Sequence, residues 1–120
     1  MATYVDGFLI ALPKKNIEEY KKMARAAGKV WRKHGALEYK ECVLEDPTPQ
    51  SVVHTFAKAA KAKPDETVVF AFIVFKSRAH RDKVNAKVMQ DPAMGQYEGK
   101  PMPFDMKRFA YGGFEALVEA

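Results

Sequence analysis

Thr67-Val-Val-Phe-Ala-Phe-Ile-Val-Phe75 is the stretch of the chain that decides its fold. Every residue after Thr67 is apolar, and most are β-branched or aromatic, the types that favour strands. An apolar run without polar alternation is typical of a short strand that is covered on both faces. It is also the longest apolar run in the chain, far below the roughly 18 to 20 residues that a membrane helix needs. We therefore expect a central buried strand here.

Two segments upstream of this strand are strongly patterned. The run from Tyr4 to Leu12 is apolar on both faces and ends at Pro13, which predicts a second covered strand. The next segment predicts a long amphipathic helix, with Asn16 as its N-cap and Gly35 just past its end. Its apolar stripe recurs at spacings of three and four residues: Ile17, Tyr20, Ala24, Ala27, Trp31 and His34.

The remaining segments have weaker sequence patterns, but each can be assigned a secondary structure. Alternation over 36–45 predicts a half-exposed strand, and 46–66 is an excursion with a short helix near 56–63. Ser77 is placed to cap a helix that runs to about Gln90. The segment 106–118 predicts a last strand.

The resulting order is β-α-β, an excursion, and β-α-β within one domain spanning residues 1–120. Right-handed crossovers then give an α+β fold, the ferredoxin-like β-α-β-β-α-β sandwich, with a four-stranded antiparallel sheet and two helices on one face. The other sheet face is apolar and has no cover in this order. We expect a second copy to cover it, which predicts a homodimer joined through the sheet faces.

Composition and charge narrow the class of protein. The chain has 120 residues, a formal charge of +5 and one cysteine, Cys42, which excludes an internal disulfide and is expected to be a buried, inert thiol. No signal peptide follows Met1, so we expect a cytoplasmic protein without a membrane segment.

Residues 14–33 hold eight Lys and Arg against two Glu. We interpret them as a solvated helix face and do not favour nucleic-acid binding, because no recognition motif is present and the aromatic residues sit at core positions and not among the charges.

Several segments resemble the YbaA-like bacterial family, a domain of unknown function in the dimeric α+β barrel group. The resemblance covers nearly the whole chain and is carried by YVDGF (4–8), GKVWRKHGALEYKEC (28–42), KAKPDETVVF (61–70), SRAHRDKVNAKVMQDP (77–92) and MPFDMKRFAYGGFE (102–115). It implies the same fold and a dimer, but no activity. Similar barrels include cofactor-independent monooxygenases, haem-degrading enzymes and ligand-binding or stress proteins.

A candidate catalytic cluster follows from the topology. The first long helix ends, and the second begins, at the sheet end where the first strand starts, so Asp6, His34 and His80 should gather there with Trp31. A carboxylate beside an imidazole can fix its tautomer and tune its pKa for acid–base work. The alternatives are structural: Asp6 paired with an arginine or backbone N–H groups, His34 at a helix C-terminus, and His80 in the core.

Aromatic residues could line a pocket for a small apolar or aromatic ligand, and we select Trp31, Phe8 and Tyr111 as candidate ligand-binding residues. The histidine spacings match no local metal-ligand pattern, and no nucleotide-binding motif is present, so no metal or cofactor is expected. Two functions are favoured: a cofactor-independent, monooxygenase-like enzyme, and a non-catalytic ligand-binding or stress-related dimer. A basic nucleic-acid-associated protein is the third, less favoured alternative.

Overall fold

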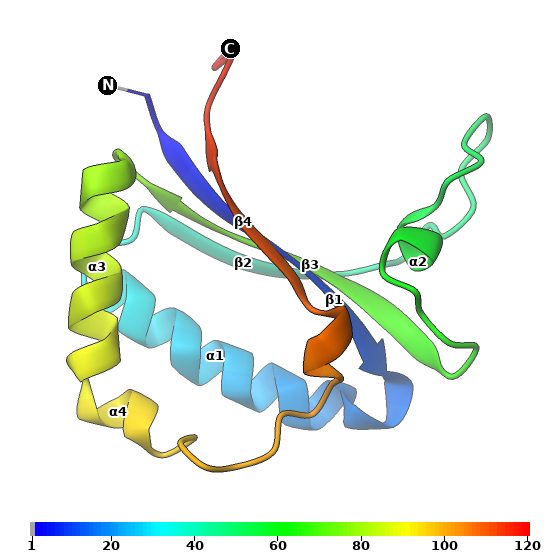
Figure 1. The fold of residues 1–120 in the computed structure, drawn as a ribbon, viewed down its shortest axis with the longest axis horizontal. Helices are drawn as coiled ribbons and strands as arrows, with labels where there is room; N and C mark the ends of the chain where they lie inside the picture. Colours follow the sequence, from blue (N-terminus) through cyan, green and yellow to red (C-terminus); the bar gives the residue numbers. More distant parts are fainter. Residues whose placement is uncertain (1) are drawn as a thin grey trace.

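The computed structural model describes residues 2–120, and it places one four-stranded antiparallel sheet between unequal layers (Figure 1). The sheet has the order β2-β3-β1-β4, which confirms the ferredoxin-like α+β prediction. Helices α1 and α3 lie on one side of the sheet, and α2 lies on the other. The elements along the chain are β1 (Tyr4–Pro13), η1 (Lys14–Asn16), α1 (Ile17–Lys33), β2 (Glu38–Val43), α2 (Phe56–Ala59), β3 (Glu66–Phe75), α3 (Arg78–Gln90), α4 (Pro92–Gly95), η2 (Met106–Arg108) and β4 (Ala110–Glu115).

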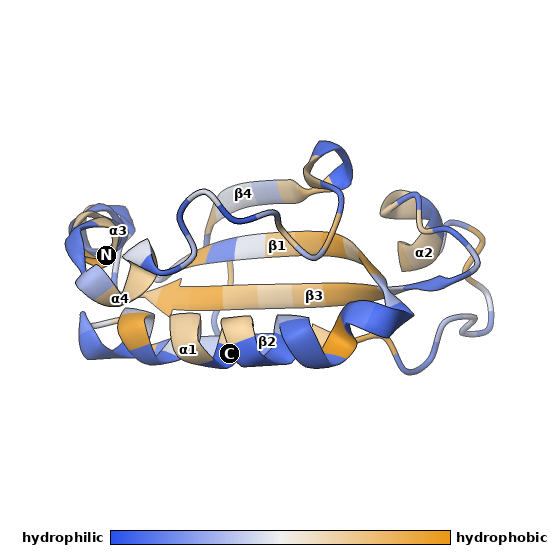
Figure 2. Cartoon of the chain, turned by 90° about the horizontal axis from the view of Figure 1, so that it is seen from below, coloured by the Kyte–Doolittle hydropathy of each residue, from blue (hydrophilic) through white to orange (hydrophobic). Residues whose placement is uncertain are grey.

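Strand β3 occupies the interior of the sheet, as its composition predicts, and it is apolar from Val68 to its end at Phe75 (Figure 2). It pairs with β1 from Tyr4↔Phe75 to Pro13↔Glu66 and with β2 on its other edge. Because side chains alternate along a strand, Ile73 and Phe75 enter the core beneath the helices, whereas Phe70 lies on the rear face. The core therefore sits in the layer between the sheet and α1 and α3.

The helix boundaries confirm two of the three predicted signals. Ser77 caps α3 by accepting a hydrogen bond from the backbone N–H of His80, and Gly35 ends α1 with φ of 115°. Asn16 occupies the predicted N-cap position of α1, but its side chain makes no capping hydrogen bond. A 3₁₀ turn precedes α1, and the Asn16 amide instead donates to the carbonyl of Pro103 at 2.8 Å. Asn16 thus anchors the loop that follows α4.

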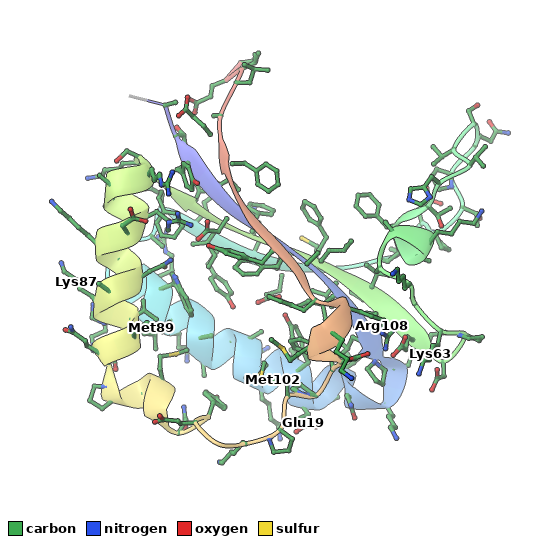
Figure 3. The ribbon with its side chains drawn as sticks, viewed as in Figure 1. Glu19, Lys63, Lys87, Met89, Met102 and Arg108 are labelled. Atoms are coloured by element: carbon green, nitrogen blue, oxygen red, sulfur yellow. The ribbon has the colours of Figure 1, made fainter. Side chains whose placement is uncertain are left out.

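The segment around 46–66 forms the predicted excursion, with α2 shorter than expected. Ala60, just after α2, packs on Ala11 and Val68 and so covers one end of the rear sheet face. Strand β4 is also shorter than predicted, because η2 occupies the start of the segment. Arg108 holds η2 in place through two hydrogen bonds to the Glu66 carboxylate, of 2.6 and 2.8 Å (Figure 3).

The rest of the rear face is apolar and exposed. Phe70 is 46% exposed and Phe114 is 62% exposed, and with Phe56 they border a groove of about 560 Å³. Cys42 is exposed too, so the prediction of a buried thiol is wrong; its strand, β2, lies at the edge of the sheet, where fewer neighbours cover it. Within residues 2–120, no helix has the length and apolarity needed to cross a membrane.

Candidate functional site

Asp6 lies in the middle of a closed polar cluster on the helix side of β1. Its side chain is almost wholly buried, and the whole residue is 1% exposed. The guanidinium of Arg81, on α3, donates from Nη1 to the Asp6 carboxylate at 2.7 Å and to the hydroxyl of Tyr111 at 2.8 Å. The same guanidinium stands over the ring of Tyr4, 4.9 Å from its centroid. The cluster therefore pairs a buried anion with a largely buried cation, which also donates to the exposed carboxylate of Asp82 at 2.8 Å.

Burial raises the pKa of the Asp6 carboxyl, whereas Arg81, Tyr111 and Asn85 oppose that rise. Asn85 also accepts a hydrogen bond of 3.0 Å from the indole N–H of Trp31, so it links α1 to the cluster. The structural alternative for Asp6, pairing with an arginine, is thus the arrangement that the structure contains.

His34 lies at the end of α1 and contacts Asp91, its Nε2 standing 2.7 Å from the carboxylate. Lys33 donates to the same carboxylate oxygen at 3.2 Å, and Asp91 also accepts from the backbone N–H of Ala93 at the start of α4. The Ala93 N–H, and then His34 and Lys33, lower the pKa of Asp91 to about 2. His34 therefore joins α1 to α4.

His80 lies in the first turn of α3, with its ring edge-on to Phe75. Its Nδ1 faces the backbone N–H of Lys76 at 3.0 Å, and an unprotonated nitrogen is needed to accept that bond. Burial, followed by the charges of three nearby lysines (Lys76, Lys83 and Lys87), lowers the pKa of His80. The neutral imidazole that results closes the turn between β3 and α3.

The three predicted catalytic residues have separate partners: His80 lies in the first turn of α3, whereas His34 contacts Asp91 just after the end of that helix. Asp6 is held by Arg81, His34 by Asp91, and His80 by the main chain. No hydrogen bond joins Asp6 to either imidazole in the part of the chain that the structure describes. Their catalytic role stays a prediction, and the carboxylate–imidazole pair on which it was based is not formed.

A partly open cavity of about 280 Å³ lies beneath α1, bordered on its outer side by α4 and the segment between α4 and β4. Trp31 and Phe8, two of the three predicted ligand-binding residues, line it. Tyr111 does not line this cavity; it stacks on Phe8 at 5.0 Å and contributes to the rear groove. Helix α4 and the segment that follows it supply mainly apolar side chains to the cavity: Met94, Tyr97, Met102, Phe104 and Phe109.

Glu41 on β2 brings a carboxylate to this apolar lining. Tyr20 donates its hydroxyl to Glu41 Oε1 and Tyr39 donates to Oε2, both at 2.6 Å. Burial, and then the charge of Glu41, raises the pKa of both tyrosines, so they stay protonated donors. The sequence reasoning missed Glu41, although one signal was present: it lies on the same side of β2 as Tyr39, where the alternation places apolar residues.

Gly28 explains how Tyr39 reaches its position. A Cβ at residue 28 would lie 2.8 Å from Cδ1 of the Tyr39 ring, closer than side chains tolerate. The missing side chain lets the ring pack against the backbone of α1, which carries the Tyr39 hydroxyl to Glu41. The glycine is unfavourable within a helix, by about 1 kcal/mol relative to alanine, so this contact has an energetic cost.

The strand order and the two long helices on one face define an α+β protein of the ferredoxin-like class. A crystal structure at 1.85 Å resolution of a dimeric ferredoxin-like protein from an uncultured marine organism has the same fold. It aligns with a TM-score of 0.60 over 100% of both chains at 12% sequence identity.

The family model described as "Protein of unknown function (DUF1428)" matches residues 3–106. The chain is 42% identical over 116 residues to the uncharacterized protein YbaA of Escherichia coli (strain K12) and to that of Shigella flexneri, with 97% of each chain covered. The chain belongs to this family, which confirms the YbaA-like resemblance seen in the sequence.

Proposed function

We propose that the protein is a homodimer that binds a small, flat apolar ligand in the cavity beneath α1. The observation that carries this proposal is the cavity itself, whose lining is mainly apolar, with Lys40 and the Tyr20–Glu41–Tyr39 group as its charged and hydrogen-bonded polar members. Its volume of about 280 Å³ is several times that of one water molecule, and few polar groups are available to hold water there. An apolar site with a small number of placed polar groups is typical of small-molecule pockets.

The lining of the cavity favours a planar ligand that can vary in outline. Trp31 and Phe8 present ring faces and edges, which stack well on aromatic molecules. Met23, Met94 and Met102 also border the cavity, and unbranched thioether side chains adapt to irregular shapes. The Glu41 carboxylate would accept a hydrogen bond from a hydroxyl or amine on the ligand.

The geometry favours binding over catalysis by the residues first considered. Asp6, His34 and His80 each have a structural partner, and none of them lines the cavity. A cofactor-independent oxygenase would therefore need Glu41 as its acid–base group. Turnover of a bound phenol or quinol with dioxygen, abolished by Glu41→Gln, would establish that alternative.

Phenylnaphthylamine, a neutral fluorescent aromatic amine, is a suitable probe for the cavity. Ala27 lines the cavity, so Ala27→Trp should fill it and weaken probe binding at least about tenfold. The matched control is Ala86→Trp, on the exposed side of α3, which should bind the probe as the wild type does. The smaller Ala27→Leu replacement serves if the indole prevents folding. Equal probe affinity in the wild type and both Ala27 variants would overturn the proposal.

The dimer is supported by the exposed apolar rear face and by the ferredoxin-like protein described as dimeric. A stable interface of this kind buries roughly 1,600 Å² or more, and the phenylalanines of the rear face would lie within it. In sedimentation at micromolar concentration, the wild type should be a dimer and Phe70→Glu a monomer. Met89→Glu, which changes a residue on α3 that is 67% exposed, should leave the dimer intact. A monomeric wild type would refute the interface.

A further inference from the structure

A second hollow, separate from the cavity beneath α1, lies between α1 and the edge strand β2. It has a volume of about 500 Å³, and we name it the α1–β2 groove. Tyr20, Tyr39 and Glu41 form the wall that the groove and the cavity share. The floor is apolar and is made by residues of α1 and the sheet: Ile17, Ala24, Gly28, Val43 and Val69.

The open side of the groove carries a row of positive charges. Lys21, Arg25 and Lys29 follow one another at every fourth position of α1, so they stand along one edge of the groove, and Arg32 continues the row. Arg32 is turned to the carbonyls of Ala36 and Leu37.

The cations in the middle of this row have no carboxylate partner. Lys21 is 3.6 Å from Glu18, whereas no ion pair within residues 2–120 includes Arg25 or Lys29. Glu41 is the acidic residue that lines the groove, and each of its two oxygens already accepts a tyrosine hydroxyl. The groove therefore combines an apolar floor with a rim of uncompensated positive charge.

Gly28 gives the groove its depth at this point. Because residue 28 has no side chain, the Tyr39 ring rests against the helix backbone at Gly28, and Arg25 and Lys29 line the same groove as this ring. Lysines and arginines that are only solvated need no apolar hollow beneath them. A solvated helix face alone therefore does not account for the groove.

We propose that the α1–β2 groove binds an amphipathic organic anion, whose carboxylate, sulfonate or phosphate group contacts Arg25 and Lys29. The apolar body of this ligand lies on the floor, against the rings of Tyr20 and Tyr39. Charge complementarity selects this occupant over a neutral or cationic amphiphile, which would leave the two cations unpaired. The groove lies on the helix side of the sheet, so a dimer formed through the rear face leaves it open.

The test uses two probes with the same aromatic skeleton. Anilinonaphthalene sulfonate carries an anionic group that phenylnaphthylamine lacks, so the pair separates the groove from the neutral cavity. In wild-type protein at low salt, we expect the sulfonate to bind, and its affinity to fall as salt screens the exposed cations. In the double variant Arg25→Gln/Lys29→Gln, sulfonate affinity should fall about tenfold or more, while binding of the neutral probe is unchanged.

The matched control is Lys83→Gln/Lys87→Gln, which removes the same charge from α3. Both residues are exposed, and Lys87 stands on the outer side of that helix (Figure 3). The control should bind both probes as the wild type does. Equal loss of sulfonate binding in both double variants would show that net charge alone attracts the anion, and would overturn the proposal. Unchanged binding in Arg25→Gln/Lys29→Gln would overturn it as well.

The two proposals fail independently. Ala27→Trp should weaken binding of the neutral probe at least about tenfold and leave sulfonate binding intact, because Ala27 lines the cavity and is not part of the groove. If the wild type does not bind the neutral probe, the function proposed for the cavity is refuted and the groove is not. Loss of sulfonate binding in Ala27→Trp, with full binding in Arg25→Gln/Lys29→Gln, would place both probes in the cavity.

Discussion

Asp6 and Glu41 are two carboxylates on the same side of one sheet, yet their surroundings are opposite. Asp6 is closed in by α3 and is paired with a cation, Arg81, whereas Glu41 accepts hydrogen bonds from two neutral tyrosines and has a hollow on either side. A buried ion pair cannot exchange partners without leaving a charge uncompensated. A carboxylate held by hydroxyl groups beside open space can do so at lower cost. The comparison indicates that Asp6 serves the fold and that Glu41 is placed for a ligand.

We expect the largest change in stability for Asp6→Ala, which tests whether Asp6 serves the fold. The change leaves the largely buried guanidinium of Arg81 with the exposed carboxylate of Asp82 in place of a buried one, so we expect a loss of about 2–4 kcal/mol in the free energy of unfolding, measured in urea. Asp6→Asn combined with Arg81→Met removes both charges and should recover most of that loss. A loss below about 1 kcal/mol, together with weaker binding of phenylnaphthylamine, would show that Asp6 belongs to the site and not to the fold.

Gly28→Ala should have an intermediate effect, in the region of Glu41. Alanine favours the helix by about 1 kcal/mol, but its Cβ forces the Tyr39 ring to move, so we expect a net loss of about 1–2 kcal/mol. In a Tyr39→Ala background the clash is gone, and Gly28→Ala should instead stabilise the protein. Thermal unfolding of the four proteins in this double-mutant cycle measures the coupling. Additive effects would contradict the contact.

The smallest change in stability is expected for Tyr39→Phe, which removes one hydroxyl from Glu41. The loss should be about 1 kcal/mol, because Tyr20 still donates to the carboxylate. The variant should nevertheless change the affinity for a phenolic ligand, since it leaves one oxygen of Glu41 available. Calorimetric titration with naphthol compares the two proteins. Unchanged affinity would mean that Glu41, like Asp6, is closed to ligands.

The fold could be predicted because the hydrophobic patterns of its main elements are clear. The apolar runs that became β1 and β3, and the stripe that became α1, each specify their own structure, and only one common topology joins them. The exposed thiol of Cys42 could not be predicted in this way. Its exposure depends on β2 being an edge strand, which follows from the assembled sheet and not from the neighbouring residues.

The sequence predicted which helix end lies against Asp6, but it did not predict which side chain contacts the carboxylate. The start of α3 does lie against Asp6, yet the residue that faces the carboxylate is Arg81 and not its neighbour His80. Adjacent residues in a helix point about 100° apart, so a small rotation of α3 decides between them. The cavity was harder still to predict, because the loop of residues 96–105 that borders it has no periodic pattern.

The bond between Arg108 and Glu66 has a consequence for the order in which the sheet comes apart in acid. Arg108 first, and then backbone contacts of Glu66, lower the pKa of the Glu66 carboxyl from 4.5 to about 2. The stabilisation is therefore complete above pH 4.5 and is lost as the pH falls toward about 2. Because this bond joins η2 to β3, and β4 follows η2 with β1 as its one neighbour in the sheet, acid should release the outermost strand first. Amide hydrogen exchange would then report a protein whose β4 opens while β1 and β3 are still closed.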